Sequence, residues 1–258
     1  MLHPFTPEIS DVHFHNGNSA QALSLLPHTT SQQALDGMGL PTGQPVLVII
    51  GGASLMSAES LERLQTVFDQ VFAPLAQSLG LTVLDGGTDA GVIHMMGQAR
   101  HTIGGTFRLI GVVPQGKARL PSDRPAADSR HDLEPNHTNF FLIPGDSWGS
   151  ESPWLAELAS DIATDHPALT LLINGGQVAL TDLSENLATG RPAIVLSGSG
   201  RLADTIAAAI TAAPPETDPA ILDLIQRYQP SGKLTVIDLA LPVDQMRDRL
   251  QNYFTSPR

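Results

Sequence analysis

Five glycine turns carry the residues of this sequence that are best suited to bind an anion. They are Gly51-Gly52, Gly86-Gly87, Gly145, Gly175-Gly176, and Gly198 with Gly200. Each follows a short aliphatic run and precedes a segment with helical spacing, so free backbone N–H groups at a helix start are expected there. Such groups bind phosphate, and glycine lets it approach closely. The turns predict a phosphate-binding edge, although a single glycine pair could be only a tight turn.

The segment Ser197-Gly198-Ser199-Gly200-Arg201 is the most suggestive of these turns. It combines two glycines and two hydroxyls with a guanidinium at an expected helix start. A phosphate there would accept N–H, O–H and bidentate arginine hydrogen bonds together. The chain has only 14 Lys and Arg residues, and Arg201 is the cation that we expect to bind the ligand. The alternative is a surface arginine paired with Asp204.

Polar side chains beside the turns extend the expected site. Asp89, Asp146 and Glu151 could accept hydrogen bonds from ribose hydroxyls, and Trp148 could stack on a base. The residues expected to bind ligand are Gly51, Gly52, Gly86, Gly87, Thr88, Asp89, Asn136, His137, Gly145, Asp146, Gly175, Gly176, Gln177, Ser197, Gly198, Ser199, Gly200 and Arg201.

Two histidine motifs have a second interpretation. Asn136 and His137 precede an expected strand, where they either contact the ligand or brace the preceding loop. His13 and His15 alternate as on a strand and could hold a metal, but no further ligand is recognisable and a solvated pair is favoured. The sequence has no cysteine, which excludes disulfides and thiolate sites. No metal site and no specific cofactor are predicted, only a nucleotide-type ligand.

Composition excludes several classes of partner. The net charge of -12 and the lack of a basic run make nucleic acid an unfavourable partner. No segment has the length of apolar sequence that a membrane span needs, and we expect a cytoplasmic protein. Neither G-x-G-x-x-G nor G-x-x-x-x-G-K-[ST] occurs, so the fingerprints of NAD-dependent dehydrogenases and P-loop enzymes are missing.

Alternating strands and helices must position these residues. From residue 45 onward, buried-type strands such as Val46 to Ile50 alternate with segments of helical spacing. This order predicts an α/β fold with a doubly wound, mainly parallel sheet in a single domain spanning 45–258. Residues 1–44 lack a sustained period and are expected to pack on the core as an extension. The proline-rich segment 114–137 is long enough to predict a mobile binding loop or lid.

Five segments resemble, in order, those of a known family. They are 85–92 (DGGTDAGV), 109–114 (LIGVVP), 133–140 (LEPNHTNF), 174–176 (NGG) and 198–204 (GSGRLAD). From about residue 46 to 210 the chain resembles the SLOG superfamily, specifically prokaryotic relatives of the N-terminal region of TRPM channels. The resemblance implies a Rossmann-like fold and recognition of ADP-ribose, cyclic ADP-ribose or NAD. It also implies a ligand-binding role for Arg201.

Two alternatives remain open. The LOG-type phosphoribohydrolases of the same superfamily split nucleotide glycosidic bonds with a P-G-G-x-G-T-x-x-E motif. Here Val178 and Ala179 replace the third glycine and the threonine of the motif, and Asp182 occupies the position of the catalytic glutamate. Asp182 is therefore either a general base or an exposed structural acid. These relatives form dimers, so a homodimer is expected. The other alternative is a scaffold that keeps the fold without a ligand and fills its pocket with its own side chains.

Overall fold

The fold is a central sheet covered by helices on both faces. The computed structural model describes residues 8–123, 128–212 and 216–255. In this part of the chain, nine strands form one sheet in the order β1-β2-β8-β5-β4-β3-β9-β10-β11. The strands are β1 (Glu8–His13), β2 (Ser19–Ser24), β3 (Val46–Gly51), β4 (Thr82–Asp85), β5 (Leu109–Pro114), β8 (Asn139–Ile143), β9 (Ala168–Ile173), β10 (Ala193–Ser197) and β11 (Leu234–Asp238).

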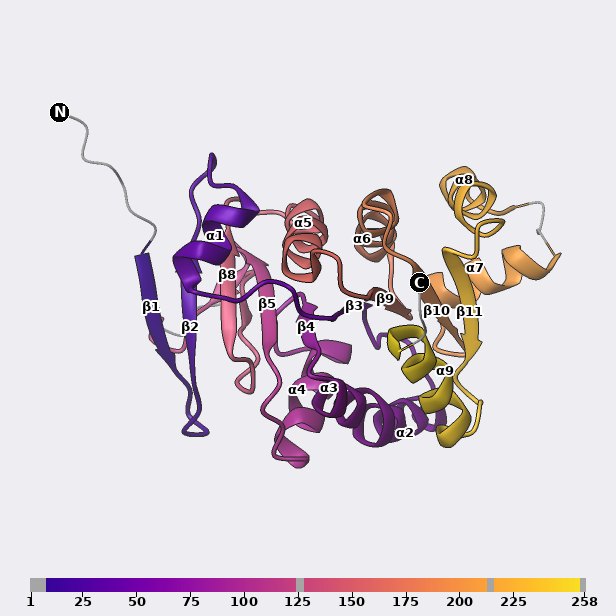
Figure 1. The fold of residues 1–258 in the computed structure, drawn as a ribbon, viewed down its shortest axis with the longest axis horizontal. Coiled ribbons are helices and arrows are strands. Elements are labelled where there is room, and N and C mark those ends of the chain that lie inside the picture. Colours follow the sequence, from indigo (N-terminus) through magenta and orange to yellow (C-terminus); the bar gives the residue numbers. More distant parts are fainter. Residues whose placement is uncertain (1–7, 124–127, 213–215, 256–258) are drawn as a thin grey trace.

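Helices lie above and below this sheet (Figure 1). One apolar core includes side chains from α1 (Ser31–Met38), α5 (Ser152–Ala163), α6 (Gln177–Ala188), α7 (Arg201–Ala212) and α8 (Pro219–Tyr228). The core on the opposite face includes side chains from α2 (Ala58–Val67), η1 (Phe68–Phe72), α3 (Ala73–Leu79), α4 (Gly91–Thr102) and α9 (Val243–Thr255). The predicted single-domain α/β fold with a doubly wound sheet is confirmed.

Strand pairing explains why the central strands are aliphatic. Every adjacent pair is parallel except β1 and β2, and helices therefore cover both faces. Val46 to Ile50 of β3 are all buried. The connection after β3 enters α2 on one face, whereas the connection after β9 enters α6 on the other. The adjacent strands β3 and β9 therefore form a switch point, where open α/β sheets bind ligands.

The first described residues extend the sheet. Strands β1 and β2 form an antiparallel hairpin, and β2 pairs in parallel with β8. Helix α1 follows and packs on the core of its face. Thr30 and Gln33 form a capping box at its start, and Gly39 ends it in the left-handed conformation. Residues 8–38 thus supply sheet and helix.

The long segment 114–137 is bound to the rest of the fold near both ends, where the N–H of Gln115 donates to Ile143 and the N–H of Glu134 donates to Gly87. Its short strands β6 (Ala118–Arg119) and β7 (His131–Asp132) pair with each other. Arg130 forms ion pairs with Asp123 and Asp128, although such surface pairs add little stability. Residues 124–127 lie outside the described part, and the mobility of the segment stays a prediction. Within the described chain, no helix has the length and apolarity needed to cross a membrane.

Candidate functional site

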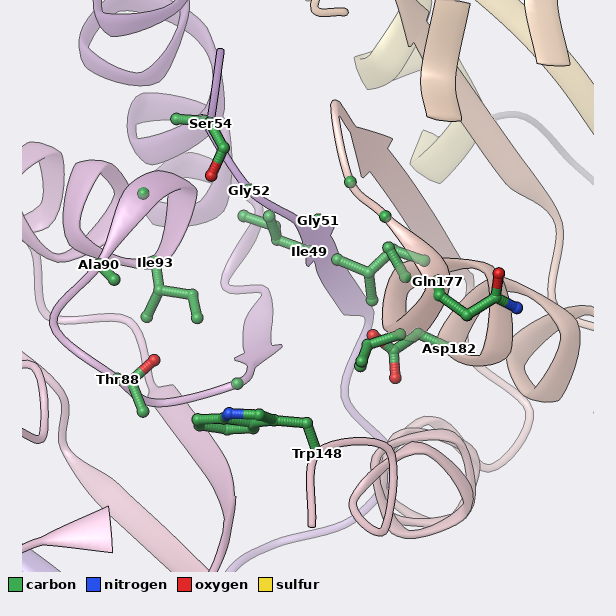
Figure 2. Close-up of a pocket in the computed structure, with 18 of the residues that line it drawn as sticks. Ile49, Gly51, Gly52, Ser54, Thr88, Ala90, Ile93, Trp148, Gln177 and Asp182 are labelled. Atoms are coloured by element: carbon green, nitrogen blue, oxygen red, sulfur yellow. The ribbon is translucent and has the colours of Figure 1, made fainter. Parts of the chain in front are cut away.

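A cavity of about 500 Å³ opens at the switch point between β3 and β9. Figure 2 shows its lining side chains, with Thr88 and Ile93 on one side, Asp182 and Gln177 on the other, and Trp148 between the two sides. The segments that follow β3, β4 and β9 all contribute, as do the first residues of α4, α6 and α7. The cavity therefore receives the N-termini of three helices, whose N–H groups and dipoles favour an anion.

The structure brings about half of the sequence-predicted site together here. The expected ligand-binding residues that line the cavity are Gly51, Gly52, Gly86, Thr88, Gly175, Gly176, Gln177 and Arg201. Glu151 and Trp148, which we expected to contact a ribose and a base, also line it, as does Asp182, the candidate general base.

Glycine is needed at the floor because backbone segments touch there. Gly51 has φ +124°, and a Cβ on it would lie 1.9 Å from the carbonyl oxygen of Ile173 in β9. A Cβ on Gly176 would lie 2.7 Å from Nη2 of Arg201. Gly51 is thus required by strand packing, whereas Gly176 makes room for the guanidinium group.

Asn174 holds three of the turns in place. Its side-chain amide donates hydrogen bonds to the carbonyl oxygens of Ser54, at 3.1 Å, and Ser199, at 2.7 Å. Its Oδ1 accepts from the N–H of Gly175 at 2.8 Å, and its own N–H donates to Ser199 Oγ at 2.7 Å. Asn174 is fully buried and has φ +54°, a conformation that asparagine adopts more readily than most residues. The turn geometry at the cavity therefore depends on this side chain.

Arg201 provides an available cation at the cavity. It is the first residue of α7, it is exposed, and its guanidinium lies against Gly176. The alternative pair with Asp204 is not among the ion pairs of the described residues, and Oδ1 of Asp204 instead accepts from the N–H of Gly198 at 2.6 Å. In the described residues, Arg201 has no ion pair. Its five N–H donors are thus free to bind an anionic group.

Two carboxyl groups form an acidic end of the same cavity. Asp182 is only 8% exposed, and the hydroxyl of Ser152 donates to it at 2.5 Å. Burial raises the pKa of Asp182 to about 7; the charge of Glu151 adds to the rise, and the Ser152 hydrogen bond opposes it. Burial also raises the pKa of Glu151, which accepts from the N–H of Gly149 at 2.7 Å. Asp182 is therefore a buried acid whose pKa lies near neutral pH. It is not the exposed structural acid of the alternative interpretation.

The other predicted residues do not line this cavity. These are Gly87, Asp89, Asn136, His137, Gly145, Asp146, Ser197, Gly198, Ser199 and Gly200. Gly87 packs against β5, where a Cβ would lie 2.9 Å from the Cα of Gly111. Gly145 and Asp146 follow β8, which is separated from β3 by two strands. Ser199 supports the turn through its hydrogen bonds to Asn174.

His137 lies in a separate buried cluster. Its Nε2 is 2.9 Å from Asp85 Oδ1, and its Nδ1 is 2.8 Å from Glu134 Oε2. Burial lowers the pKa of His137, but the charge of Asp85 and the hydrogen bonds with both acids outweigh it and raise the pKa to about 9. Asp85 also accepts from the N–H of Gly87, and Asn136 donates to Glu134. This arrangement matches the expected bracing role.

Sequence reasoning missed two residues with structural importance at the cavity. Asn174 was noted as part of a motif but not as the residue that joins the turns, and Ser152 was not considered as part of the site. The available signal for Asn174 was an asparagine before two glycines, which indicates a left-handed position. Nothing local indicated that Ser152 contacts Asp182, because the two residues lie on different helices.

Comparison with known proteins agrees with the fold. The family model described as SLOG in TRPM, prokaryote, matches residues 44–246. The chain is 24% identical to transient receptor potential cation channel subfamily M member 2 of Mus musculus over 208 residues. The match covers 67% of this chain and 14% of the channel. The Rattus norvegicus channel of the same name is 24% identical to the chain over 204 residues, which cover 66% of this chain and 13% of the channel. The member-like 2 channel of Nematostella vectensis is 25% identical over 198 residues, or 62% and 13%.

The chain thus spans a small part of each of these channels, about 14% of the mouse protein. The family model, in contrast, covers most of the chain and includes all the turns at the cavity. This protein belongs to the prokaryotic family of SLOG domains that is described as SLOG in TRPM.

Proposed function

We propose that the cavity between β3 and β9 binds a nucleotide-derived small molecule. The observation that carries the proposal is the position of Arg201, an exposed guanidinium without an ion pair in the described chain, beside three helix N-termini. A phosphate at Gly176 would receive backbone N–H groups from α6 and a charge-assisted bond from Arg201. The volume of about 500 Å³ is in the range of small-molecule sites.

The acidic end orients the rest of the ligand. Asp182 and Glu151 would repel a second phosphate but accept hydrogen bonds from ribose hydroxyls. Trp148, 38% exposed and directed toward the cavity, offers a face on which a base can stack (Figure 2). The family assignment supports a nucleotide-related domain. ADP-ribose, NAD and cyclic ADP-ribose are the ligands that we propose to test, because each joins phosphate to ribose.

Calorimetric titration with these three compounds tests the proposal. We expect at least one to bind, and Arg201→Ala to weaken binding by about 1.5 to 3 kcal/mol, the usual loss for a hydrogen bond to a charged group. Arg201→Lys should restore part of the loss, because it keeps the charge without the planar fork. Arg249→Ala, an exposed arginine on α9, is the matched control. Binding by none of the three compounds, or equal binding by Arg201→Ala, would contradict the proposal.

A second candidate function is hydrolysis of a nucleotide N-glycosidic bond. Asp182 favours it, because its carboxyl group lines the cavity and has a pKa raised to about 7, which suits a general acid or base. Chromatography of nucleoside monophosphates and NAD after prolonged incubation would show free base if this is correct, and Asp182→Asn should abolish the product. Unchanged substrates would remove this candidate while leaving the binding proposal intact.

The described side chains do not favour the scaffold alternative. That interpretation predicts a pocket filled by the chain itself, whereas about 500 Å³ remains unfilled beside Arg201. The predicted homodimer is tested separately, by measuring the mass of the purified protein in solution.

A further inference from the structure

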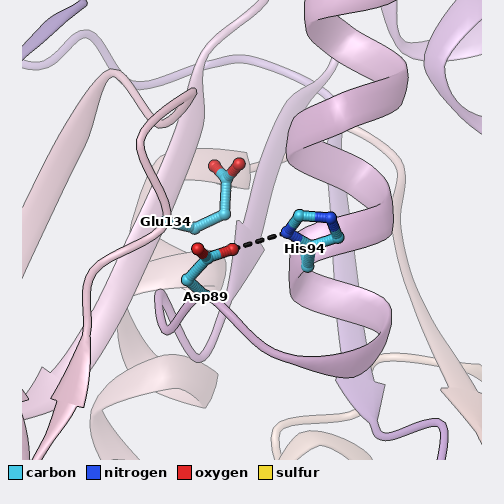
Figure 3. Close-up of side chains that lie close together, drawn as sticks. All are labelled: Asp89, His94 and Glu134. Carbon is cyan, nitrogen blue, oxygen red and sulfur yellow. Dashed lines mark hydrogen bonds and ion pairs between the residues drawn. The ribbon is translucent and has the colours of Figure 1, made fainter. Parts of the chain in front are cut away.

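Three potential metal ligands meet outside the cavity. Asp89 follows the turn after β4, His94 lies in the first turns of α4, and Glu134 lies near the end of the long segment (Figure 3). One ligand atom from each of the three residues lies within 4.8 Å of the other two. Nδ1 of His94 is 2.5 Å from Oδ1 of Asp89. We propose that these three side chains form a binding site for a divalent transition-metal cation.

Backbone pairing fixes the two carboxylates relative to each other. The N–H of Asp89 donates to the carbonyl oxygen of Asp132 at 2.8 Å, and the N–H of Glu134 donates to that of Gly87 at 3.0 Å. Thr88 and Leu133 form an antiparallel bridge between these bonds. The backbones of Asp89 and Glu134 are therefore held side by side, although 45 positions separate them in the sequence.

Gly97 allows Glu134 to reach the helix. It lies one turn after His94 on α4, and a Cβ there would be 2.1 Å from the carboxyl carbon of Glu134. The lack of a side chain thus creates the space in which this carboxylate lies. Glu134 is fully buried, whereas the side chains of Asp89 and His94 are 36% and 48% exposed. The cluster is therefore buried at Glu134 and open to solvent at Asp89 and His94, where a cation can enter.

The donor set suits a transition metal. One imidazole nitrogen and two carboxylate oxygens bind Mn²⁺ to Zn²⁺ in preference to Mg²⁺ or Ca²⁺, which take oxygen ligands. At metal bonds of about 2.1 Å the ligand atoms are about 3.3 Å apart, so the exposed Asp89 and His94 must separate slightly. Asp89 also borders a second cavity of about 490 Å³, which provides room for water ligands.

The surrounding groups orient Glu134 without using all of its lone pairs. Oε1 accepts from the amide of Asn136, and Oε2 accepts from His137 and from the N–H of Asn136. A carboxylate has about four acceptor positions, so one remains for a cation. Arg100 and His137 offset the charges of Glu134 and Asp85, whereas among the described residues Asp89 pairs only with His94. A cation would compensate the charge of Asp89.

Calorimetric titration of the full chain with ZnCl₂ tests the site. We expect one strong site in the wild type and binding at least about tenfold weaker in His94→Ala and in Asp89→Asn. Both side chains are exposed, so these variants should fold. His101→Ala, an exposed histidine on the same helix, is the matched control and should bind as the wild type does.

Gly97→Ala tests the contribution of Glu134 without changing a ligand. The added methyl group displaces the carboxylate, so Zn²⁺ binding should weaken while circular dichroism shows a folded chain. MgCl₂ should bind at least about tenfold more weakly than ZnCl₂ in the wild type. No Zn²⁺ binding by the wild type, or equal binding by His94→Ala, would overturn the proposal. The result is independent of nucleotide binding, because none of the three ligands lines the first cavity.

Discussion

The Arg201 cavity and the His137 cluster both border the turn that follows β4, but they differ in how their charged groups are satisfied. Arg201 has no ion pair in the described chain, and Asp182 accepts a hydrogen bond from Ser152. His137 is enclosed by Asp85 and Glu134, and its side chain has no exposed surface. Position beside a glycine turn is therefore not sufficient to identify a ligand contact. A charged group that has no ion pair and lies beside an open cavity is a better indicator of a ligand contact.

The largest expected effect is on the buried cluster. His137→Ala would leave Asp85 and Glu134 without their shared cationic partner, and removal of one partner from a buried pair costs about 3 to 5 kcal/mol. Urea denaturation should show this loss in the free energy of unfolding. His101→Ala, on the surface, should have almost no effect. A loss below about 1 kcal/mol in His137→Ala would mean that the cluster does not brace the turn.

The next effect depends on pH. The pKa of Asp182 rises from 3.8 to about 7 on folding, so the folded state binds this proton more tightly than the unfolded state does. The stability that protonated Asp182 contributes is therefore lost as pH rises from about 4 to about 7. Asp182→Asn cannot ionise, and it should become more stable than the wild type across that interval, by about 2 to 4 kcal/mol above pH 7.

Urea denaturation at pH 4.5 and pH 8 checks this prediction. Asp161→Asn is the matched control, because Asp161 also accepts from a serine hydroxyl at 2.5 Å but is partly exposed. It should show a much smaller gain. The same stability difference at both pH values for Asp182→Asn would contradict the assigned protonation behaviour.

A smaller loss is expected at the residue that joins the turns. Asn174→Ala removes hydrogen bonds to Ser54 and Ser199 and places a Cβ-bearing residue without a polar side chain at φ +54°. We expect a loss of about 2 to 3 kcal/mol in the free energy of unfolding. Asn174→Gly tolerates the backbone conformation and should be less destabilised, by about 1 kcal/mol. Equal losses would show that the hydrogen bonds alone matter.

The smallest effect on stability is expected at Arg201. Arg201→Ala should change the free energy of unfolding by less than about 0.5 kcal/mol, since the side chain is exposed and has no ion pair in the described residues. Thermal melting with and without the nucleotides separates this effect on stability from the binding role proposed for Arg201. A large loss in the free energy of unfolding without ligand would show that Arg201, like His137, has a structural role.

The periodic parts of the sequence were sufficient to predict the core of the fold. Val46 to Ile50 is an uninterrupted aliphatic run, which is typical of a strand buried on both faces. The hairpin of β1 and β2 was not predicted, because a sheet edge needs no such run. A local signal for α1 was present, however, in the capping residues Thr30 and Gln33.

The site was less predictable than the fold. Sequence order placed every glycine turn at the same edge, but it did not indicate which turns flank the switch point. Gly51, Gly176 and Arg201 meet because β3 and β9 are neighbours, whereas Gly145 follows a strand farther along the sheet. The approach of His94 to Glu134 was equally hidden, because it depends on the packing of α4 against a distant loop.

The pairing of β3 with β9 also determines when the cavity can exist during folding. Val46 pairs with Ala168 and Gly51 with Ile173, so this contact closes a very long stretch of chain. Contacts of such large sequence separation form slowly, because the entropy of loop closure is lost before the contact stabilises the chain. The strands β4, β5 and β8 can assemble beside β3 first. During synthesis from the N-terminus, the chain therefore gains the cavity between β3 and β9 only after β9 has joined the sheet.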